Sequence, residues 1–547
     1  MLSTMQDGEL SVARLLQHGA SVHGDSGVRT WTGTGSRVES YRELGARAAR
    51  LANVLRKLSV TGGQRVGTFM WNNNEHMEAY VAVPAMGAVL HTLNIRLFPE
   101  QLIYTINHAD DHVIIVDANL LALFTQLLPW LKSVRHVVVA NGDKSALDAP
   151  PFVAVHGYDE LLAAESEEFS WPRVDEHSAA AMCYTSGTTG DPKGVAYSHR
   201  SIWLHAMQLC MTDGFGITQG DVVLAITPMF HAMSWGAPYA ALMVGASLVM
   251  TDRFLQPAAI AAMLAAEKPN IGLAVPTIWQ GLLTYLETHA QDISPLKRAV
   301  LGGSACPASL MRSFADRYGV EVLQAWGMTE TSPLGTVAHA PAAARGEQAL
   351  AYRLTQGRFP AGVRARIVDD RGKELPWDGK TVGQLEVGGP WVTARYYSPD
   401  TPACVAQDTT DSWLRTGDVG HISPDGFLTL TDRAKDVIKS GGEWISSIQL
   451  ENAVMAHPAV SEAAVIAIPD EKWQERPLVA VVLRQGAHAS ANELRAFLVG
   501  KLAKWQLPEN WCFIDEVPKT SVGKFDKKRL RARYADGELN VQCCPTN

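Results

Sequence analysis

Short apolar runs alternate with helix-like segments through much of the chain. The pattern holds from about residue 65 to residue 325, and its apolar runs include 113–116, 137–140, 222–226 and 299–301. Such runs, separated by segments of helical periodicity, are typical of strands that alternate with helices. We therefore predict an α/β fold in which a large N-terminal domain is built of layered α/β subdomains.

The pattern changes after about Gly357, where strand-like segments alternate with Gly and Pro turns. Examples are the segment 383–388 and the turn at 423–426, which precedes the strand-like segment 427–430. Alternation with a period of two between turn residues indicates strands. We predict a β-rich subdomain in this part of the N-terminal domain.

A mostly polar run, 432–442, is followed by a different pattern of helices and strands. The later segments are helical at 447–455 and 492–502 and strand-like at 463–468 and 478–483. This mixture indicates a separate α+β unit. We place the boundary near Lys435, which predicts an N-terminal domain of residues 1–433 and a smaller, mobile α+β C-terminal domain of residues 434–547.

The composition is that of an ordinary globular enzyme without a general attraction for polyanions. The 547 residues are 47% hydrophobic and 19% charged, with a net charge of -8. An anion site in an acidic chain must be built locally, from lysines and glycine loops. The seven cysteines are odd in number and lack the spacing of a disulfide framework, which predicts free thiols in a reducing, cytoplasmic setting.

No segment has the pattern of an export signal or a stable membrane anchor. Residues 1–10 lack a basic start followed by an apolar run. The segment 222–251 has no Asp, Glu, Lys or Arg, but prolines and glycines interrupt it, so we expect buried core there. The basic residues near the C-terminus suit a solvated helix better than a nucleic-acid site, and no nucleic-acid partner is expected.

The strongest local motif is the hydroxyl- and glycine-rich loop of residues 184–195, which contains Lys193. Glycines let backbone N–H groups approach phosphate oxygens, hydroxyl groups add donors, and a lysine adds positive charge. The loop therefore suits a polyphosphate. It differs from the loop of P-loop NTPases, which needs Ser or Thr directly after the lysine, where this chain has Gly194.

The same loop resembles the signature motif of the adenylate-forming superfamily, which includes acyl-CoA synthetases, peptide-synthetase adenylation domains and luciferases. Further motifs of that superfamily follow in order at 228–231, 302–304, 325–330, 416–418, 432–435 and 518–524. The segments 229–239, 302–307 and 326–333 look like those of medium-chain fatty-acid CoA ligases and methylmercaptopropionate CoA ligases. The resemblance implies an ATP-dependent acid-thiol ligase.

The resemblance implies a site for ATP and Mg²⁺ in the N-terminal domain. Thr185 and Glu330 would hold the metal ion, because a hydroxyl and a carboxylate suit a hard cation. The residues implied in binding ATP or AMP are Thr185, Ser186, Gly187, Thr188, Thr189, Lys193, Gly303, Ser304, Gln324, Ala325, Trp326, Thr329, Asp418, Arg433, Lys435 and Lys439. Three residues of this site have a structural alternative, since Glu330 could serve a helix start, Trp326 could be a core side chain and Asp418 could be a structural acid of its turn.

The resemblance also assigns residues to the chemical steps. Lys524 would stabilise transition-state charge between the attacking carboxylate and the α-phosphate, unless it belongs to the solvated basic face around it. Glu330 and His231 complete the implied catalytic set. The implied acyl pocket is His231, Trp235, Gly302 and Gly327, although core packing would explain His231 and Trp235 equally well. The implied loop for the coenzyme A step is Lys439, Ser440, Gly441, Gly442 and Trp444, presented to coenzyme A after rotation about Lys435.

The implied reaction has two halves. A carboxylate attacks the α-phosphate of ATP to give acyl-AMP and pyrophosphate, and the thiol of coenzyme A then displaces AMP. The expected partners are ATP, coenzyme A and a small carboxylic acid, with a medium-chain fatty acid favoured and a homodimer left open. The alternatives are a methylmercaptopropionate or other short-chain acyl-CoA ligase, an acyl-AMP ligase that delivers to a carrier protein, a luciferase-like oxidase and a non-catalytic binding module.

Overall fold

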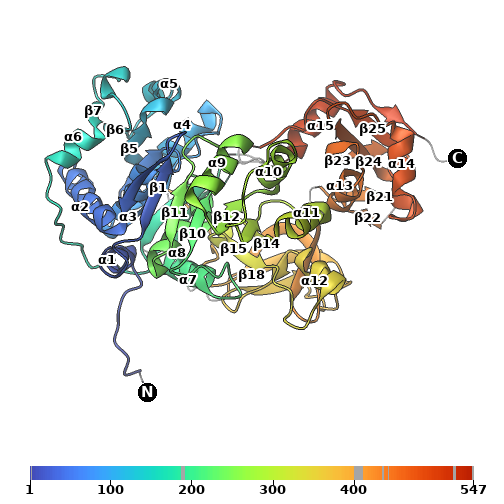
Figure 1. Ribbon diagram of the computed structural model, residues 1–547, viewed down its shortest axis with the longest axis horizontal. Coiled ribbons are helices and arrows are strands. Elements are labelled where there is room, and N and C mark those ends of the chain that lie inside the picture. The colour runs from blue at the N-terminus through green and yellow to red at the C-terminus, as the bar shows by residue number, and fades with distance from the viewer. Residues whose placement is uncertain are drawn as a thin grey trace.

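The computed structural model describes residues 1, 3–185, 191–399, 411–433, 436–440, 443–520 and 525–544, without the side chains of Arg433, Glu443 and Trp444. Over these residues, two large sheets with their helices form the N-terminal domain, and a third sheet forms the smaller C-terminal domain. The molecule is elongated, with the C-terminal domain at one end of its long axis (Figure 1). The predicted α/β fold class is confirmed.

The larger sheet joins a parallel α/β region to the β-rich subdomain. Among the described residues its strand order is β17-β18-β19-β20-β16-β15-β14-β13-β12-β10-β11-β1-β2. The strands of the parallel region are β1 (Gly27–Trp31), β10 (Val222–Ala225), β11 (Ser247–Met250), β12 (Ile271–Ala274), β13 (Arg298–Leu301) and β14 (Glu321–Gly327), with β2 (Ser36–Ser40) antiparallel at the edge. The predicted strands at 222–226 and 299–301 are β10 and β13.

The β-rich subdomain continues the same sheet with antiparallel pairs. Its strands are β15 (Leu334–Val337), β16 (Gly357–Arg358), β17 (Arg364–Val368), β18 (Gly383–Gly388), β19 (Leu414–Ile422) and β20 (Phe427–Arg433). The predicted turn at 423–426 connects β19 to β20, where the Ser423 N–H donates to the Phe427 carbonyl. The subdomain expected after Gly357 is therefore present.

The helices between the parallel strands are α8 (Ala237–Val244), α9 (Pro257–Glu267), α10 (Pro276–Thr288) and α11 (Ala308–Tyr318), and α12 (Gly346–Arg353) lies between β15 and β16. Proline occupies the first turn of α8, α9 and α10. It is favoured there because its missing N–H would have no partner within the helix.

The second sheet has the order β7-β6-β5-β3-β4-β8-β9. Its strands are β3 (Arg65–Phe69), β4 (Val89–Thr92), β5 (Asp111–Asp117), β6 (His136–Ala140), β7 (Ala154–Gly157), β8 (Ala179–Tyr184) and β9 (Gly194–Ser198). The apolar runs predicted as strands at 113–116 and 137–140 lie in β5 and β6. The helices of this half are α1 (Val12–Val22), α2 (Tyr41–Lys57), α4 (Pro99–Ala109), α5 (Leu121–Thr125), α6 (Tyr158–Ala163) and α7 (His199–Cys210).

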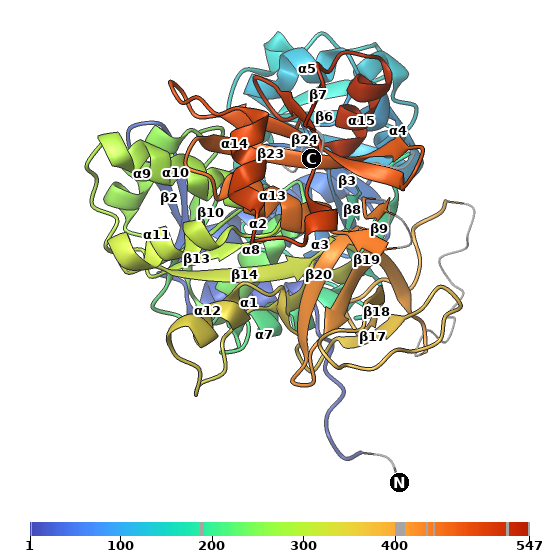
Figure 2. The same ribbon diagram turned by 90° about the vertical axis from the view of Figure 1, so that its right-hand side faces the viewer.

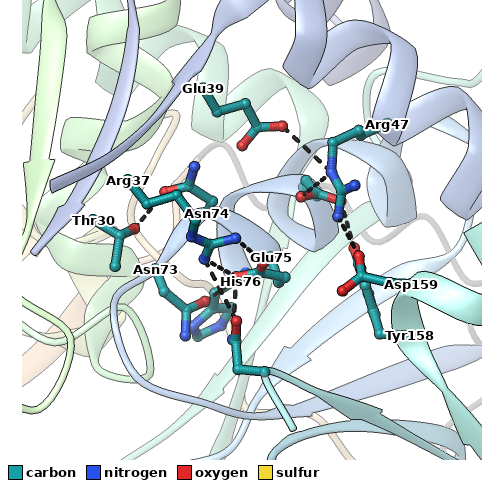
Figure 3. A network of polar contacts seen from close by, with 12 residues as sticks. Thr30, Arg37, Glu39, Arg47, Asn73, Asn74, Glu75, His76, Tyr158 and Asp159 are labelled. Carbon is teal, nitrogen blue, oxygen red and sulfur yellow. Dashed lines mark hydrogen bonds and ion pairs between the residues drawn. The ribbon is translucent and has the colours of Figure 1, made fainter. Parts of the chain in front are cut away.

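Helix α3 (Asn74–Ala85) joins the two sheets, and each of its residues is buried. Asn72, just before it, donates to the carbonyls of Ala225 and Thr227 beside the larger sheet. Asn73 donates to Asp117 of the second sheet. The polar side chains around the start of α3 form a buried network (Figure 3). One short segment thus ties both sheets together.

The C-terminal domain is a separate α+β unit. Its strands are β21 (Ile438–Ser440), β22 (Glu443–Ile445), β23 (Val460–Asp470), β24 (Gln474–Leu483), β25 (Asn510–Phe513) and β26 (Gln542–Cys543), and its helices are α13 (Ser447–Met455), α14 (Ala491–Leu498) and α15 (Lys527–Ala535). Viewed from its own end of the molecule, this domain lies in front of the N-terminal domain, and β14 and β20 are visible below it (Figure 2). The helix predicted at 492–502 ends earlier, because Val499 is extended and Gly500 has a φ of 81°.

The segment 222–251 is divided among β10, α8 and β11 and is mostly buried, as predicted. No helix within the described residues is long and apolar enough to cross a membrane. The six cysteines that the structure describes are free thiols.

Candidate active site

Three of the predicted motifs meet at one edge of the larger sheet. Residues 228–231 follow β10, residues 302–304 follow β13, and the motif 325–330 spans the end of β14 and the turn after it. These strands lie in one parallel series, so their carboxyl ends face the same way. Ligands of open α/β sheets bind outside the carboxyl ends of the strands. This edge is therefore the candidate active site.

The polyphosphate loop connects β8 to β9, and its two ends are hydrogen bonded to each other. The Thr185 N–H donates to the Lys193 carbonyl over 3.0 Å, and the Lys193 N–H donates to Oγ1 of Thr185 over 3.1 Å. A Cβ on Gly194 would lie 3.1 Å from the Tyr184 ring, so a larger residue would crowd the loop there. Ser186, Gly187, Thr188 and Thr189 lie outside the described residues.

Glu330 lies in a short 3₁₀ turn, Thr329–Thr331, directly after β14, and is 6% exposed. Its Oε1 accepts a hydrogen bond of 2.8 Å from the hydroxyl of Tyr396. The Tyr396 ring lies 4.8 Å from Nζ of Lys193. The predicted metal ligand and the predicted phosphate lysine are thus connected through a residue that the motifs did not single out.

A side chain of β14 holds the loop after β13 in place. Oε1 of Gln324 accepts the Cys306 N–H over 2.7 Å, and Nε2 of Gln324 donates to the Thr355 carbonyl over 2.9 Å. Gln324 is buried, so its side chain orients the loop that carries Gly303 and Ser304. Gly303 has a φ of 87°, which glycine adopts without strain, and Ser304 is exposed.

Trp326 and Asp418 form a buried pair that links β14 to β19. Nε1 of Trp326 donates to Oδ2 of Asp418 over 3.0 Å, and the indole is 7% exposed. The ring packs closely on Gly335, where a Cβ would lie 2.3 Å from it. Asp418 is also the register partner of Arg433 across β19 and β20. The structure therefore shows Trp326 supporting Asp418, while most of its ring lies in the core.

The predicted acyl-pocket residues follow β10 in an unusual turn. Met233, Ser234 and Trp235 have φ between 50° and 55°, a left-handed conformation that costs non-glycine residues free energy. Ser234 holds the turn, since its Oγ donates to the Thr227 carbonyl over 2.8 Å. The Trp235 ring lies 3.1 Å from where a Cβ on Gly302 would be.

The other acyl-pocket residues lie nearby on the same edge. His231 is partly buried and precedes the left-handed turn. Gly327 is confined by the backbone, because a Cβ there would meet the Pro333 carbonyl oxygen at 1.8 Å. The carbonyl oxygen of Ala325 lies 3.3 Å from where a Cβ on Gly302 would be. The Trp235 ring and the Ala325 carbonyl therefore both lie beside Gly302.

The structure describes only some of the site residues predicted in the C-terminal domain. Lys439 is exposed on β21, opposite Trp444 of β22, and the buried Ser440 accepts a hydrogen bond from Arg476. Lys435, Gly441, Gly442 and the catalytic candidate Lys524 lie outside the described residues.

The joint between the domains carries its own polar contacts. Oδ2 of Asp432, at the end of β20, accepts hydrogen bonds from the N–H and hydroxyl of Ser447 at the start of α13. Nζ of Lys527 donates to the same Ser447 hydroxyl and pairs with Glu451 over 2.7 Å. The motif pattern named Asp432 but gave no sign of Ser447 or Lys527.

The donor set suits a magnesium ion that is shared with a ligand. No group of three or more His, Cys, Asp or Glu that could hold a metal occurs among the described residues. Thr185 and Glu330 supply one hydroxyl and one carboxylate, both hard oxygen donors. Mg²⁺ commonly binds through one or two carboxylates together with substrate phosphates. The residues present therefore fit the ion when a polyphosphate completes the site.

Residues 16–397 match the AMP-binding enzyme family, and residues 449–524 match the C-terminal domain of AMP-binding enzymes. The chain belongs to the AMP-binding enzyme family. This membership explains why the loop at 184–195, the carboxyl edge of the larger sheet and the small C-terminal domain occur in one protein.

Relatives within the AMP-binding family cover almost the whole chain. The medium-chain-fatty-acid–CoA ligase of Ectopseudomonas oleovorans is 42% identical over 98% of this chain and 98% of its own. The 3-methylmercaptopropionyl-CoA ligase of Ruegeria lacuscaerulensis is 42% identical over 98% and 99%, and the long-chain-fatty-acid–CoA ligase of Thermus thermophilus is 44% identical over 97% and 97%. Among solved structures, ATP-bound MatB from Rhodopseudomonas palustris is similar with a TM-score of 0.81 and 26% identity, over 97% of this chain and 99% of its own.

Proposed function

We propose that this AMP-binding enzyme is an AMP-forming fatty acyl-CoA synthetase that joins a medium-chain fatty acid to coenzyme A at the expense of ATP. The observation that carries the proposal is the 42% identity to a medium-chain-fatty-acid–CoA ligase over 98% of both chains. The contact of Trp235 with Gly302 next to the Trp326–Asp418 pair agrees with an acyl site beside a nucleotide site.

In the first half-reaction, the fatty carboxylate attacks the α-phosphate of ATP and pyrophosphate leaves. The loop at 184–195 and Lys193 would bind the phosphates, Asp418 would accept the ribose hydroxyls, and Lys524 would stabilise the charge on the reacting groups. Bound Mg²⁺, held by Thr185 and Glu330, would neutralise part of the triphosphate charge. No residue need form a covalent bond with the substrate.

In the second half-reaction, the thiol of coenzyme A attacks the acyl carbonyl of acyl-AMP and AMP leaves. We propose that the C-terminal domain, from residue 434 onward, rotates about Lys435 between the halves, so that Lys439 to Trp444 replaces Lys524 at the site. The free thiols support our proposal that the enzyme works in the reducing cytoplasm.

A second candidate activity is 3-methylmercaptopropionyl-CoA formation, since a ligase of that name is also 42% identical over 98% of the chain. An apolar pocket separates acids that differ by one methylene only weakly, so identity alone does not choose the acid.

The test is release of pyrophosphate and AMP with ATP and Mg²⁺ over straight-chain acids of increasing length and methylmercaptopropionate, each with and without coenzyme A. The proposal expects thioester formation that peaks at medium-chain acids. A peak at methylmercaptopropionate would favour the second candidate. Pyrophosphate release without thioester, followed by transfer to a carrier protein, would instead identify an acyl-AMP ligase.

A further inference from the structure

Tyr396 belongs to a short segment that joins the two halves of the proposed ATP site. The Thr393 N–H donates to the Glu330 carbonyl over 2.8 Å, and the Tyr397 N–H donates to the Gly194 carbonyl over 2.8 Å. The backbone of residues 393–397 therefore connects the turn after β14 to the start of β9, and Tyr396 lies between these two attachments.

The Tyr396 side chain contacts one acidic and one basic residue of the site. Its hydroxyl donates to Oε1 of Glu330 over 2.8 Å. A buried carboxylate needs such a donor, because burial without a partner is costly.

The ring of Tyr396 lies 4.8 Å from Nζ of Lys193, a distance suited to a cation–π contact. Lys193 and Glu330 have opposite charges, yet no ion pair joins them within the described residues, where each contacts Tyr396 instead. A direct ion pair would neutralise the ammonium that phosphate needs and the carboxylate that a cation needs.

We propose that Tyr396 is a positioning residue for Mg·ATP, which holds Glu330 and Lys193 apart and oriented before the ligand binds. The inference rests on the proposed function for its ligand. The Tyr396 hydroxyl contacts the Glu330 carboxylate and the Tyr396 ring contacts the Lys193 ammonium, so different substitutions of Tyr396 can separate the two roles.

The experiment compares Tyr396→Phe, Tyr396→Leu and Tyr397→Phe in the full-length protein. Tyr397 is the matched control, because it lies in the same segment and its hydroxyl makes no hydrogen bond within the described residues. Calorimetry measures binding of a non-hydrolysable ATP analogue with and without Mg²⁺, and kinetics measure the Mg²⁺ concentration for half-maximal rate and the KM for the acid.

Tyr396→Phe should raise the half-saturating Mg²⁺ concentration about five- to twentyfold, as expected for loss of one hydrogen bond to a carboxylate. It should leave analogue binding without Mg²⁺ and the KM for the acid within about twofold of wild type. Tyr396→Leu should additionally weaken analogue binding without Mg²⁺, because the ring is lost. Tyr397→Phe should resemble wild type.

The inference is overturned if Tyr396→Phe matches Tyr397→Phe in its Mg²⁺ response, or if it weakens Mg²⁺ response and acid binding equally, as a general structural defect would. The proposed function fails separately, when wild type binds Mg·ATP but forms no thioester with any acid. Because calorimetry needs neither acid nor coenzyme A, the two failures are distinguishable.

Discussion

The indole N–H of Trp326 donates a hydrogen bond of 3.0 Å to the carboxylate of Asp418, 92 positions later in the chain. Both side chains are buried, so the carboxylate keeps its orientation without the nucleotide. The pair fastens the end of β14 to β19 of the β-rich subdomain, which places the proposed ribose acceptor beside the loops of the α/β region.

Trp326→Phe should raise the KM for ATP about tenfold, because a hydrogen bond to a charged group contributes about 1.5–3 kcal/mol. The KM for the acid should change less. Steady-state kinetics test this against Trp473→Phe, a substitution at a tryptophan that is 42% exposed. An unchanged KM for ATP would show that Asp418 does not depend on the indole.

Gly302→Ala should shift the preferred acid toward shorter chains. The new Cβ would lie 3.1 Å from the Trp235 ring and 3.3 Å from the Ala325 carbonyl, so the indole must move into the proposed pocket. We expect kcat/KM to fall at least about tenfold for the longest acid accepted, against a smaller loss for short ones. Gly281→Ala, whose Cβ would make an ordinary contact of 3.4 Å with Pro257, is the control. An equal loss of kcat/KM for acids of all chain lengths would mean that Gly302 and Trp235 do not line the acyl pocket.

Asp432→Asn should loosen the joint between the domains. The carboxylate accepts two hydrogen bonds from Ser447, and Lys527 bonds to the same hydroxyl. Asparagine keeps one acceptor oxygen but loses the negative charge, and a hydrogen bond to a charged group contributes about 1.5–3 kcal/mol. Calorimetry should show an earlier unfolding transition of the C-terminal domain, and Glu462→Gln, at the more exposed ion pair with Lys519, should have little effect. If the C-terminal domain unfolds at the same temperature in Asp432→Asn and Glu462→Gln, the hydrogen bonds of Asp432 do not stabilise the joint between the domains.

Glu39→Gln should stabilise the protein increasingly as pH rises. Burial, with a smaller contribution from the nearby Glu78, raises the pKa of Glu39 well above its ordinary 4.5. Neither carboxylate oxygen accepts a hydrogen bond from the described residues, although Arg47 lies 3.7 Å away (Figure 3). The folded state therefore holds a proton that the unfolded chain releases, and the stability from that proton, present below pH 4.5, is lost as pH rises.

Because glutamine does not ionise, the variant should avoid that loss, and its gain over wild type should grow between pH 5 and pH 8 by up to about 1.4 kcal/mol per pH unit. Thermal unfolding from pH 5 to pH 9 measures the difference, with the exposed Glu471→Gln as control. A gain that is constant over this range would mean that folding does not raise the pKa of Glu39.

The sequence predicted those elements whose cause is local. The apolar runs in β5, β6 and β13 and the helix at 447–455 needed only nearby residues to be recognised. The helix predicted at 492–502 is too long, because the extended backbone of Val499 and the positive φ of Gly500 are single-residue effects that periodicity does not predict. The β-rich subdomain followed from its turn residues.

The site was predicted where a motif is contiguous and missed where contacts span the chain. Glu330 lies in a 3₁₀ turn and its carboxylate also accepts a hydrogen bond from Tyr396, so its place in the turn leaves the predicted role in metal binding open. Tyr396 could not be found, because its hydrogen-bond partner is 66 positions away and a lone tyrosine has no periodicity. The left-handed turn at Met233 and Ser234 could not be predicted either, because neither residue is a glycine or asparagine.

The complete burial of α3 also limits how this protein can be divided. A fragment that ended after β9 would retain the helix but lose later partners of it, among them the Met229 carbonyl that accepts the Tyr80 hydroxyl and the Tyr239 ring that stacks on Tyr80. It would expose apolar positions together with Asn72, whose partners Ala225, Thr227 and Met229 would be missing, and such fragments tend to aggregate. Shortened versions or chimaeras of this enzyme should therefore keep both sheets together and exchange material only beyond β20.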